Sequence, residues 1–163
     1  MSNVVTRWLA RHLRRVLVAG VAQSRQPDFI IGTDKTDPYM RRWWIIPRNK
    51  VFNVYLHEFL KDDDDRALHD HPWLSLSLAL SGYMVEKYMD KGVERQRYVM
   101  AGDVIARSGT FSHRMLVVTP SWTLFITGPV YREWGFHCPT IGWRHWKEFT
   151  APGDRGGIGK GCD

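Results

Sequence analysis

Between His69 and Gly82 the chain reads H-D-H-P-W-L-S-L-S-L-A-L-S-G, and large side chains alternate there with small ones. A period of two residues is typical of a β-strand whose two faces meet different surroundings. His69 and His71 lie two positions apart and therefore share a face, so both imidazoles can reach one metal ion. Asp70, between them, points to the opposite face.

One side of this strand is small and polar, and the other is leucine. The histidine parity continues with Trp73, Ser75, Ser77, Ala79 and Ser81, and the opposite parity is Leu74, Leu76, Leu78 and Leu80. If the histidines face the inside of a barrel, the small residues leave room for a ligand. The leucines then need a cover, which would be an N-terminal helix, the arm 24–47 or a second subunit, and we expect a homodimer to supply part of it. The reversed arrangement, with the leucines as the core, is the alternative.

Short strand-like segments surround this stretch on both sides. They are residues 42–47, 51–60, 73–81, 83–89, 94–100, 103–107, 113–119, 122–128 and 131–137. Asp90-Lys91-Gly92 and Thr119-Pro120-Ser121 are the predicted turns between neighbouring strands. Many short strands without a second helical pattern favour an all-β sandwich or barrel.

Two separated segments fit the spacing of known motifs. The first motif, G-x5-H-x-H-x3-4-E-x6-G, has its histidines on His69 and His71 and its last glycine on Gly82. The second, G-x5-P-x-G-x2-H, begins at Gly102 and ends on His113. On these residues the sequence resembles the cupin superfamily.

The resemblance covers about residues 51–128 and includes departures. Asp63 stands for the opening glycine of the first motif and Ser75 for its glutamate, while Ser108 and Thr110 stand for the proline and glycine of the second. The stretches D-D-D-D-R-A-L-H-D-H-P-W and W-G-F-H-C-P resemble a group of uncharacterised bacterial and phage cupin-like proteins.

The resemblance implies a cupin-type double-stranded β-helix, which is a jelly-roll barrel, preceded here by an N-terminal helix. It also implies that His69, His71 and His113 hold one divalent transition metal. Fe(II) is favoured, and Zn, Ni, Mn or Cu would also accept three imidazoles.

A three-histidine site without the glutamate resembles that of cupin thiol dioxygenases and of some diketone dioxygenases. This implies an Fe(II) dioxygenase acting on a small anionic substrate. The alternatives are a non-catalytic cupin that binds a small ligand or carbohydrate, and a scaffold protein that oligomerises.

Further residues are candidates for the wall of the pocket. In the run 131–138, either Trp134 and Phe136 face inward, beside Cys138 as a buried neutral thiol, or His137 does; we favour the aromatic side because large rings need burial more. Tyr55 joins Trp73, Ser75 and Ser77 as a pocket candidate. Arg66 either pairs with a neighbouring aspartate or binds an anion at the barrel mouth.

The 163 residues fit one domain. We divide them into an amphipathic helix (1–23), an arm with the first strand (24–50), the barrel (51–149) and a flexible glycine-rich tail (150–163). The helix carries arginines mostly off its apolar stripe. It packs on the domain, anchors the protein on anionic lipid or nucleic acid, or forms a signal peptide with 16–22 as its apolar core; the first interpretation is preferred.

Composition limits the remaining classes. The net charge of +6 does not establish nucleic-acid binding, and no apolar run approaches the roughly 20 residues of a membrane span. Two cysteines, Cys138 and Cys162, exclude a disulfide framework and a four-cysteine zinc site. We therefore expect reduced thiols and a cytoplasmic protein.

Overall fold

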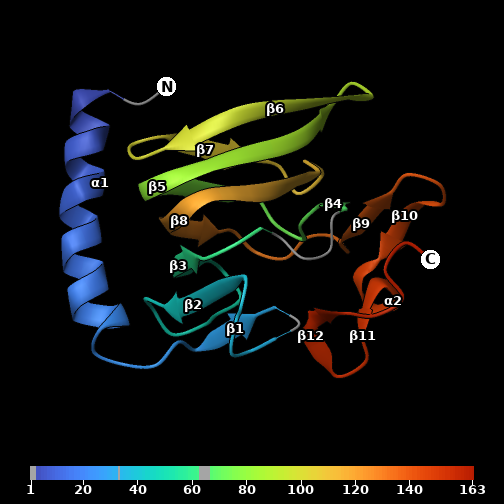
Figure 1. Cartoon of the computed structure of the whole chain (residues 1–163), viewed down its shortest axis with the longest axis horizontal. Coiled ribbons are helices and arrows are strands. Elements are labelled where there is room, and N and C mark those ends of the chain that lie inside the picture. The colour runs from blue at the N-terminus through green and yellow to red at the C-terminus, as the bar shows by residue number, and fades with distance from the viewer. Residues whose placement is uncertain (1–2, 33, 63–66) are drawn as a thin grey trace.

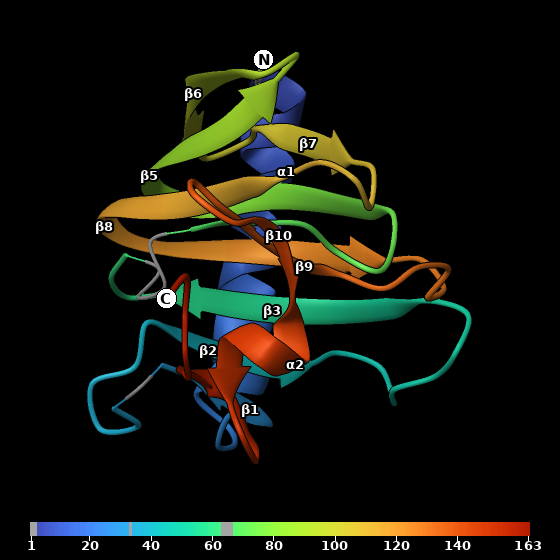
Figure 2. The same cartoon turned by 90° about the vertical axis from the view of Figure 1, so that its right-hand side faces the viewer.

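The computed structural model describes residues 3–32, 34–62 and 67–163, and within them ten strands form one antiparallel sheet that curls into a barrel (Figures 1 and 2). The elements in chain order are α1 (Val4–Leu17), the π-helical turn η1 (Val18–Ala22), β1 (Phe29–Ile31), β2 (Met40–Trp44), β3 (Asn53–Phe59), β4 (Leu68–His69), β5 (Ser75–Asp90), β6 (Val93–Met100), β7 (Val104–Arg107), β8 (His113–Thr127), β9 (Gly135–Cys138), β10 (Gly142–His145), α2 (Trp146–Phe149), β11 (Thr150–Ala151) and β12 (Asp154–Ile158). The predicted all-β jelly roll with an N-terminal helix is confirmed. No helix among the described residues is long and apolar enough to span a membrane.

Strand β8 organises the sheet. The strands follow the order β1-β2-β3-β8-β4-β9-β10, and β5 pairs with β6, β7 and β8. One end of β8 pairs His113 with His69 of β4, while its other end pairs Thr123 with His57 of β3. Residues far apart in the sequence therefore meet on the inside of the barrel.

Two pairs of predicted strands are in fact single long strands. Residues 73–81 and 83–89 fall largely in β5, and 113–119 and 122–128 fall in β8, so the predicted turn at Thr119-Pro120-Ser121 is wrong. The two strands bend together instead: their register shifts between Ala79 and Met84, and Gly82 has a φ of +90°. Irregular pairing of this kind bends a sheet without reversing the chain.

The turn at Asp90-Lys91-Gly92 is confirmed. Asp90 pairs with Val93, and the two residues between them, Lys91 and Gly92, have φ angles of 49° and 81°. Positive φ at both central positions matches the right-handed twist of the flanking strands, so this loop forms a tight hairpin.

The N-terminal helix packs on the outer face of the sheet, where it crosses the strands (Figure 2). Ala10 of α1 is buried against Leu80, with Leu78 beside it. The histidine parity of β5 faces inward, so the reversed arrangement of this strand is wrong. Leu74 is 59% exposed and Leu76 is 40% exposed in the single chain. Burial of these two leucines by a second subunit stays a prediction.

The C-terminal segment was expected to be a flexible tail with free thiols, and the structure corrects this. Strands β11 and β12 pair, the amide N–H groups of Gly159 and Gly161 donate to the carbonyl oxygen of Phe149, and Cys138 forms a disulfide with Cys162. The tail folds back because hydrogen bonds to Phe149 return it towards β9, which brings the two thiols together.

Candidate metal centre and its cavity

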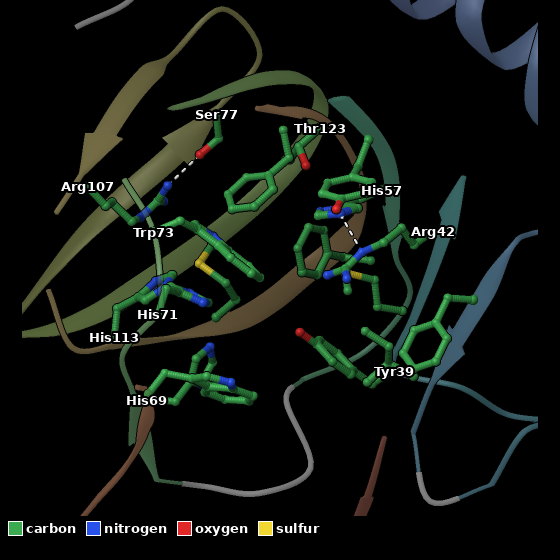
Figure 3. Close-up of a pocket in the computed structure, with 18 of the residues that line it drawn as sticks. Tyr39, Arg42, His57, His69, His71, Trp73, Ser77, Arg107, His113 and Thr123 are labelled. Atoms are coloured by element: carbon green, nitrogen blue, oxygen red, sulfur yellow. Dashed lines mark hydrogen bonds between the residues drawn. The ribbon is translucent and has the colours of Figure 1, made fainter. Parts of the chain in front are cut away.

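Three histidines converge on one wall of the barrel (Figure 3). His69 ends β4, His71 follows in the next loop, and His113 begins β8. One ring nitrogen from each lies within 4.8 Å of the others, and the Nε2 atoms of His71 and His113 are 3.0 Å apart. Backbone pairing fixes this arrangement: His69 is opposite His113, and the His71 amide donates to the Gly109 carbonyl.

Two of the three histidines, His71 and His113, are held in the neutral form that binds metals. Burial, together with the neighbouring His69 and His113, holds the pKa of His71 well below its usual value. Burial lowers the pKa of His113 to about 4, although a contact with Glu86 opposes this effect. At neutral pH these imidazoles therefore offer a lone pair without first losing a proton.

A buried carboxylate stands behind His113. Oε1 of Glu86 lies 2.6 Å from Nδ1 of His113, so the imidazole directs its other nitrogen towards the histidine cluster. The same carboxylate contacts Nε of Arg107 at 2.6 Å and Nε of Arg97 at 2.5 Å. Burial alone would raise the pKa of Glu86, but the contacts with His113 and Arg107 outweigh it and hold that pKa far below its usual value.

Sequence reasoning missed Glu86 because the strand changes parity. Before the irregular pairing at Gly82, odd-numbered residues such as Ser77 face inward; after it, Met84 and Glu86 are the fully buried positions. A glutamate within an alternating strand could have drawn attention to Glu86. The direction in which Glu86 points depends, however, on a bulge that the alternation does not locate.

The histidines open on a cavity of about 370 Å³. The structure places five of the predicted pocket residues in its lining: Tyr55, Trp73, Ser77, Trp134 and Phe136. Ser75 is buried but does not line the cavity, because it pairs with Arg107 and Thr127, whose buried side chains occupy this part of the interior. Arg66 lies outside the described residues.

The segment 131–138 turns its aromatic side inward and its histidine away. His137 instead lies 3.3 Å from the carboxylate of Asp70. Asp70 is buried and also accepts hydrogen bonds from the Gly135 amide at 2.8 Å and from Nε1 of Trp143 at 3.1 Å. The acid between the two histidines thus fastens β9 and β10 to the loop that carries His71.

The sequence matches no protein-family model and no curated protein. Solved structures do match the fold. The oxalate decarboxylase of Bacillus subtilis, which has Mn(II) centres, aligns with a TM-score of 0.51 and 18% identity over 70% of this chain and 30% of its own. The Fe(II) form of HppE aligns with a TM-score of 0.50 and 15% identity over 63% of this chain and 58% of its own. A cupin superfamily protein from Desulfitobacterium hafniense aligns with a TM-score of 0.47 and 16% identity over 55% of this chain and 77% of its own.

The chain has the cupin fold. In this chain, His69, His71 and His113 form the one group of three or more potential metal ligands among residues 3–32, 34–62 and 67–163. Three neutral imidazoles fit a divalent transition metal. The buried Glu86 behind one ligand adds the outer contact that metal-binding histidines usually have.

Proposed function

We propose that this cupin binds one divalent transition metal through His69, His71 and His113 and is a metal-dependent enzyme, namely an Fe(II) dioxygenase acting on a small anionic substrate. The observation that carries the proposal is the convergence of three imidazoles on the wall of a cavity of about 370 Å³. Bound Fe(II) would supply the redox chemistry that joins dioxygen to a substrate.

The protein's own residues would hold and shield that reaction. Glu86 keeps His113 in one tautomer and orientation, which preserves the ligand geometry. Trp73, Trp134 and Phe136 line the cavity beside the histidines and would limit the access of water to the bound metal.

An anionic ligand fits the charge of this end of the cavity. Three neutral ligands leave the full +2 charge of the ion, and the buried Glu86 is already shared by Arg107 and Arg97. Because electrostatic interactions are stronger away from bulk water, this excess of positive charge favours a carboxylate, thiolate or enolate.

Metal analysis tests the first half of the proposal. Protein purified without affinity-tag metals should bind about one equivalent of Fe(II), and each of the His69→Ala, His71→Ala and His113→Ala variants should lose most of this binding. His12→Ala is the matched control, since His12 is exposed on α1. Full metal retention by all three variants would contradict the site.

Dioxygen consumption tests the second half. Fe(II)-loaded protein should consume dioxygen with one of a panel of small thiol carboxylates or β-diketones, and nitric oxide should give a paramagnetic signal that His113→Ala lacks. A second candidate comes from the aromatic walls, because Trp73, Trp134 and Tyr55 also suit stacking on a sugar ring. Metal-independent glycan binding without dioxygen uptake would replace the dioxygenase proposal with that binding function.

A further inference from the structure

The cavity has a second polar end, away from the three histidines. Figure 3 shows Arg42, His57 and Thr123 on the opposite side of the cavity from His69 and His71. Arg42 of β2 pairs with His57 of β3, which pairs with Thr123 of β8. The three residues thus form a row across adjacent strands, and all of them line the cavity.

Arg42 has no acidic partner among the described residues. Its Nε donates a hydrogen bond to Nε2 of His57 at 2.9 Å, and its guanidinium lies 5.0 Å from the centre of the Tyr55 ring. Its neighbour Arg41, on the other face of β2, pairs with Glu58 at 3.2 Å. The buried Arg107 at the histidine end pairs with Glu86. Arg42 therefore differs both from Arg41, its neighbour on the strand, and from Arg107 at the histidine end of the cavity.

His57 cannot supply the missing negative charge. A ring nitrogen that accepts a hydrogen bond from Arg42 carries no proton, so the imidazole is neutral. Burial and the adjacent Arg42 hold the pKa of His57 well below its usual value. Asp103, the one acid in the described lining, accepts a hydrogen bond from the Met100 amide at 2.9 Å within its own turn.

Thr123 provides an independent observation at the same place. Its side chain is buried, with 5% of its surface exposed, and Oγ1 has no hydrogen-bond partner among the described residues. A buried hydroxyl without a partner is unfavourable, and so is a half-buried cation without a counter-ion. One anionic group that accepts from both Arg42 and Thr123 would relieve both costs.

We propose that Arg42 and Thr123 form an anion-binding site that holds a carboxylate or phosphate group at the end of the substrate remote from the metal. The guanidinium offers a planar pair of donors to such a group, and the exposed Arg48 adds positive charge at the rim of the same cavity. The lining also includes Met84, Met115 and Phe125, so the rest of the substrate should be largely apolar. The idea of one substrate bound at both the metal and Arg42 rests on the proposed function, whereas the anion site itself does not.

Anion binding to the metal-free protein tests the site alone. In calorimetric titrations with inorganic phosphate and with butyrate, the wild type should bind at least one of the two at millimolar concentrations. Arg42→Gln should weaken that binding by about tenfold or more, and Thr123→Val should weaken it less. Arg41→Gln is the matched control on the outer face of β2 and should bind like the wild type. The anion that binds more tightly identifies the chemical class.

Equal affinities of the wild type and Arg42→Gln, or no binding of either anion to the wild type, would overturn the proposal. Arg42→Lys covers the case in which Arg42→Gln fails to fold, because it keeps the charge and loses the planar pair of donors; it should bind more weakly than the wild type. Arg42→Met should melt at the same or a higher temperature than the wild type in anion-free buffer, because it removes a half-buried charge that has no counter-ion. A large loss of thermal stability in Arg42→Met would show that the guanidinium serves the fold rather than a ligand.

The metal-loaded protein tests the connection between the two ends. Across a series of straight-chain dicarboxylates, affinity should peak at one chain length, and the peak should disappear in Arg42→Gln and in His113→Ala. If metal does not bind but Arg42→Gln still loses anion binding, the proposed enzyme is wrong and the anion site stands. If metal binds and Arg42→Gln changes nothing, the anion site is wrong and the metal centre stands.

Discussion

Glu86 serves several neighbours with one buried carboxylate. It orients His113 and balances the charges of Arg107 and Arg97, while Arg107 also donates to the hydroxyl of Ser77. Such a network is stable only while every member is satisfied. The position of the metal ligand is therefore coupled to the packing of β5, β6 and β7.

The variant Glu86→Gln tests this coupling. It keeps the size of the side chain but removes the negative charge, so we expect metal affinity to fall about 10- to 100-fold. Thermal stability should also fall, because Arg97 and Arg107 lose their counter-ion. The control is Glu58→Gln, which removes the ion pair to Arg41 and should leave metal binding unchanged. Unchanged affinity in Glu86→Gln would mean that His113 is oriented without it.

Burial of the histidines predicts acid sensitivity of the metal-free protein. The pKa of His113 falls from an ordinary 6.5 to about 4 on folding, so the unfolded chain binds a proton more readily than the folded one. The stabilising contribution is complete above pH 6.5, declines as the pH falls and is lost below about 4. For this residue alone the loss amounts to about 3 kcal/mol. Urea unfolding at several pH values should show the decline, and His113→Gln should make it shallower.

At the scale of elements, the two long strands β5 and β8 create the cavity by bending together. The bend occurs where Gly82 faces Ser121, and a Cβ at Gly82 would lie 2.1 Å from the Ser121 Oγ and 2.6 Å from the Pro120 carbonyl oxygen. A positive φ and a close backbone approach therefore both require glycine here.

Gly82→Ala should consequently destabilise the protein by several kcal/mol, well beyond the roughly 1–2 kcal/mol of a positive φ alone. Gly92→Ala is the matched control: its φ is +81°, but a Cβ there meets nothing within 4 Å. Gly92→Ala should lower the free energy of unfolding only by the roughly 1–2 kcal/mol of a positive φ. Similar midpoints of urea unfolding for the two variants would show that the close approach at Ser121 does not limit the bend.

These elements also show what the sequence could reveal. Alternation after His69 predicted which side of β5 faces inward, because strand geometry fixes it. Alternation could not reveal that Gly82 marks a bend within one strand, since glycine also occurs in turns. Positions 41 and 42 are both arginine, and only the pairing of β2 with β3 decides which of the two faces the cavity. The end of the cavity formed by Arg42, His57 and Thr123 could therefore not be predicted from the sequence.

At the scale of the molecule, the two ends of the chain support opposite sides of the sheet (Figure 1). The helix α1 covers part of the outer face, whereas the C-terminal elements close the cavity. Trp146, Phe149 and Thr150 line it, and the ring of Phe149 stacks on Phe136 with centroids 3.6 Å apart. The residues after Phe149 thus contribute to the shape of the cavity.

The disulfide between Cys138 and Cys162 should hold this closure in place. It links β9, which carries Phe136, to the segment that folds back on Phe149. Closing a loop of 24 residues in the unfolded chain is expected to contribute about 3 kcal/mol to stability. Cys162→Ser should lower the unfolding midpoint accordingly and weaken anion binding in the cavity, whereas metal content should persist because the histidines lie on other elements. Mass spectrometry of the unreduced wild type after thiol alkylation provides the direct check. Alkylation of both cysteines in the folded wild type would exclude the bond and restore the free thiols expected from composition.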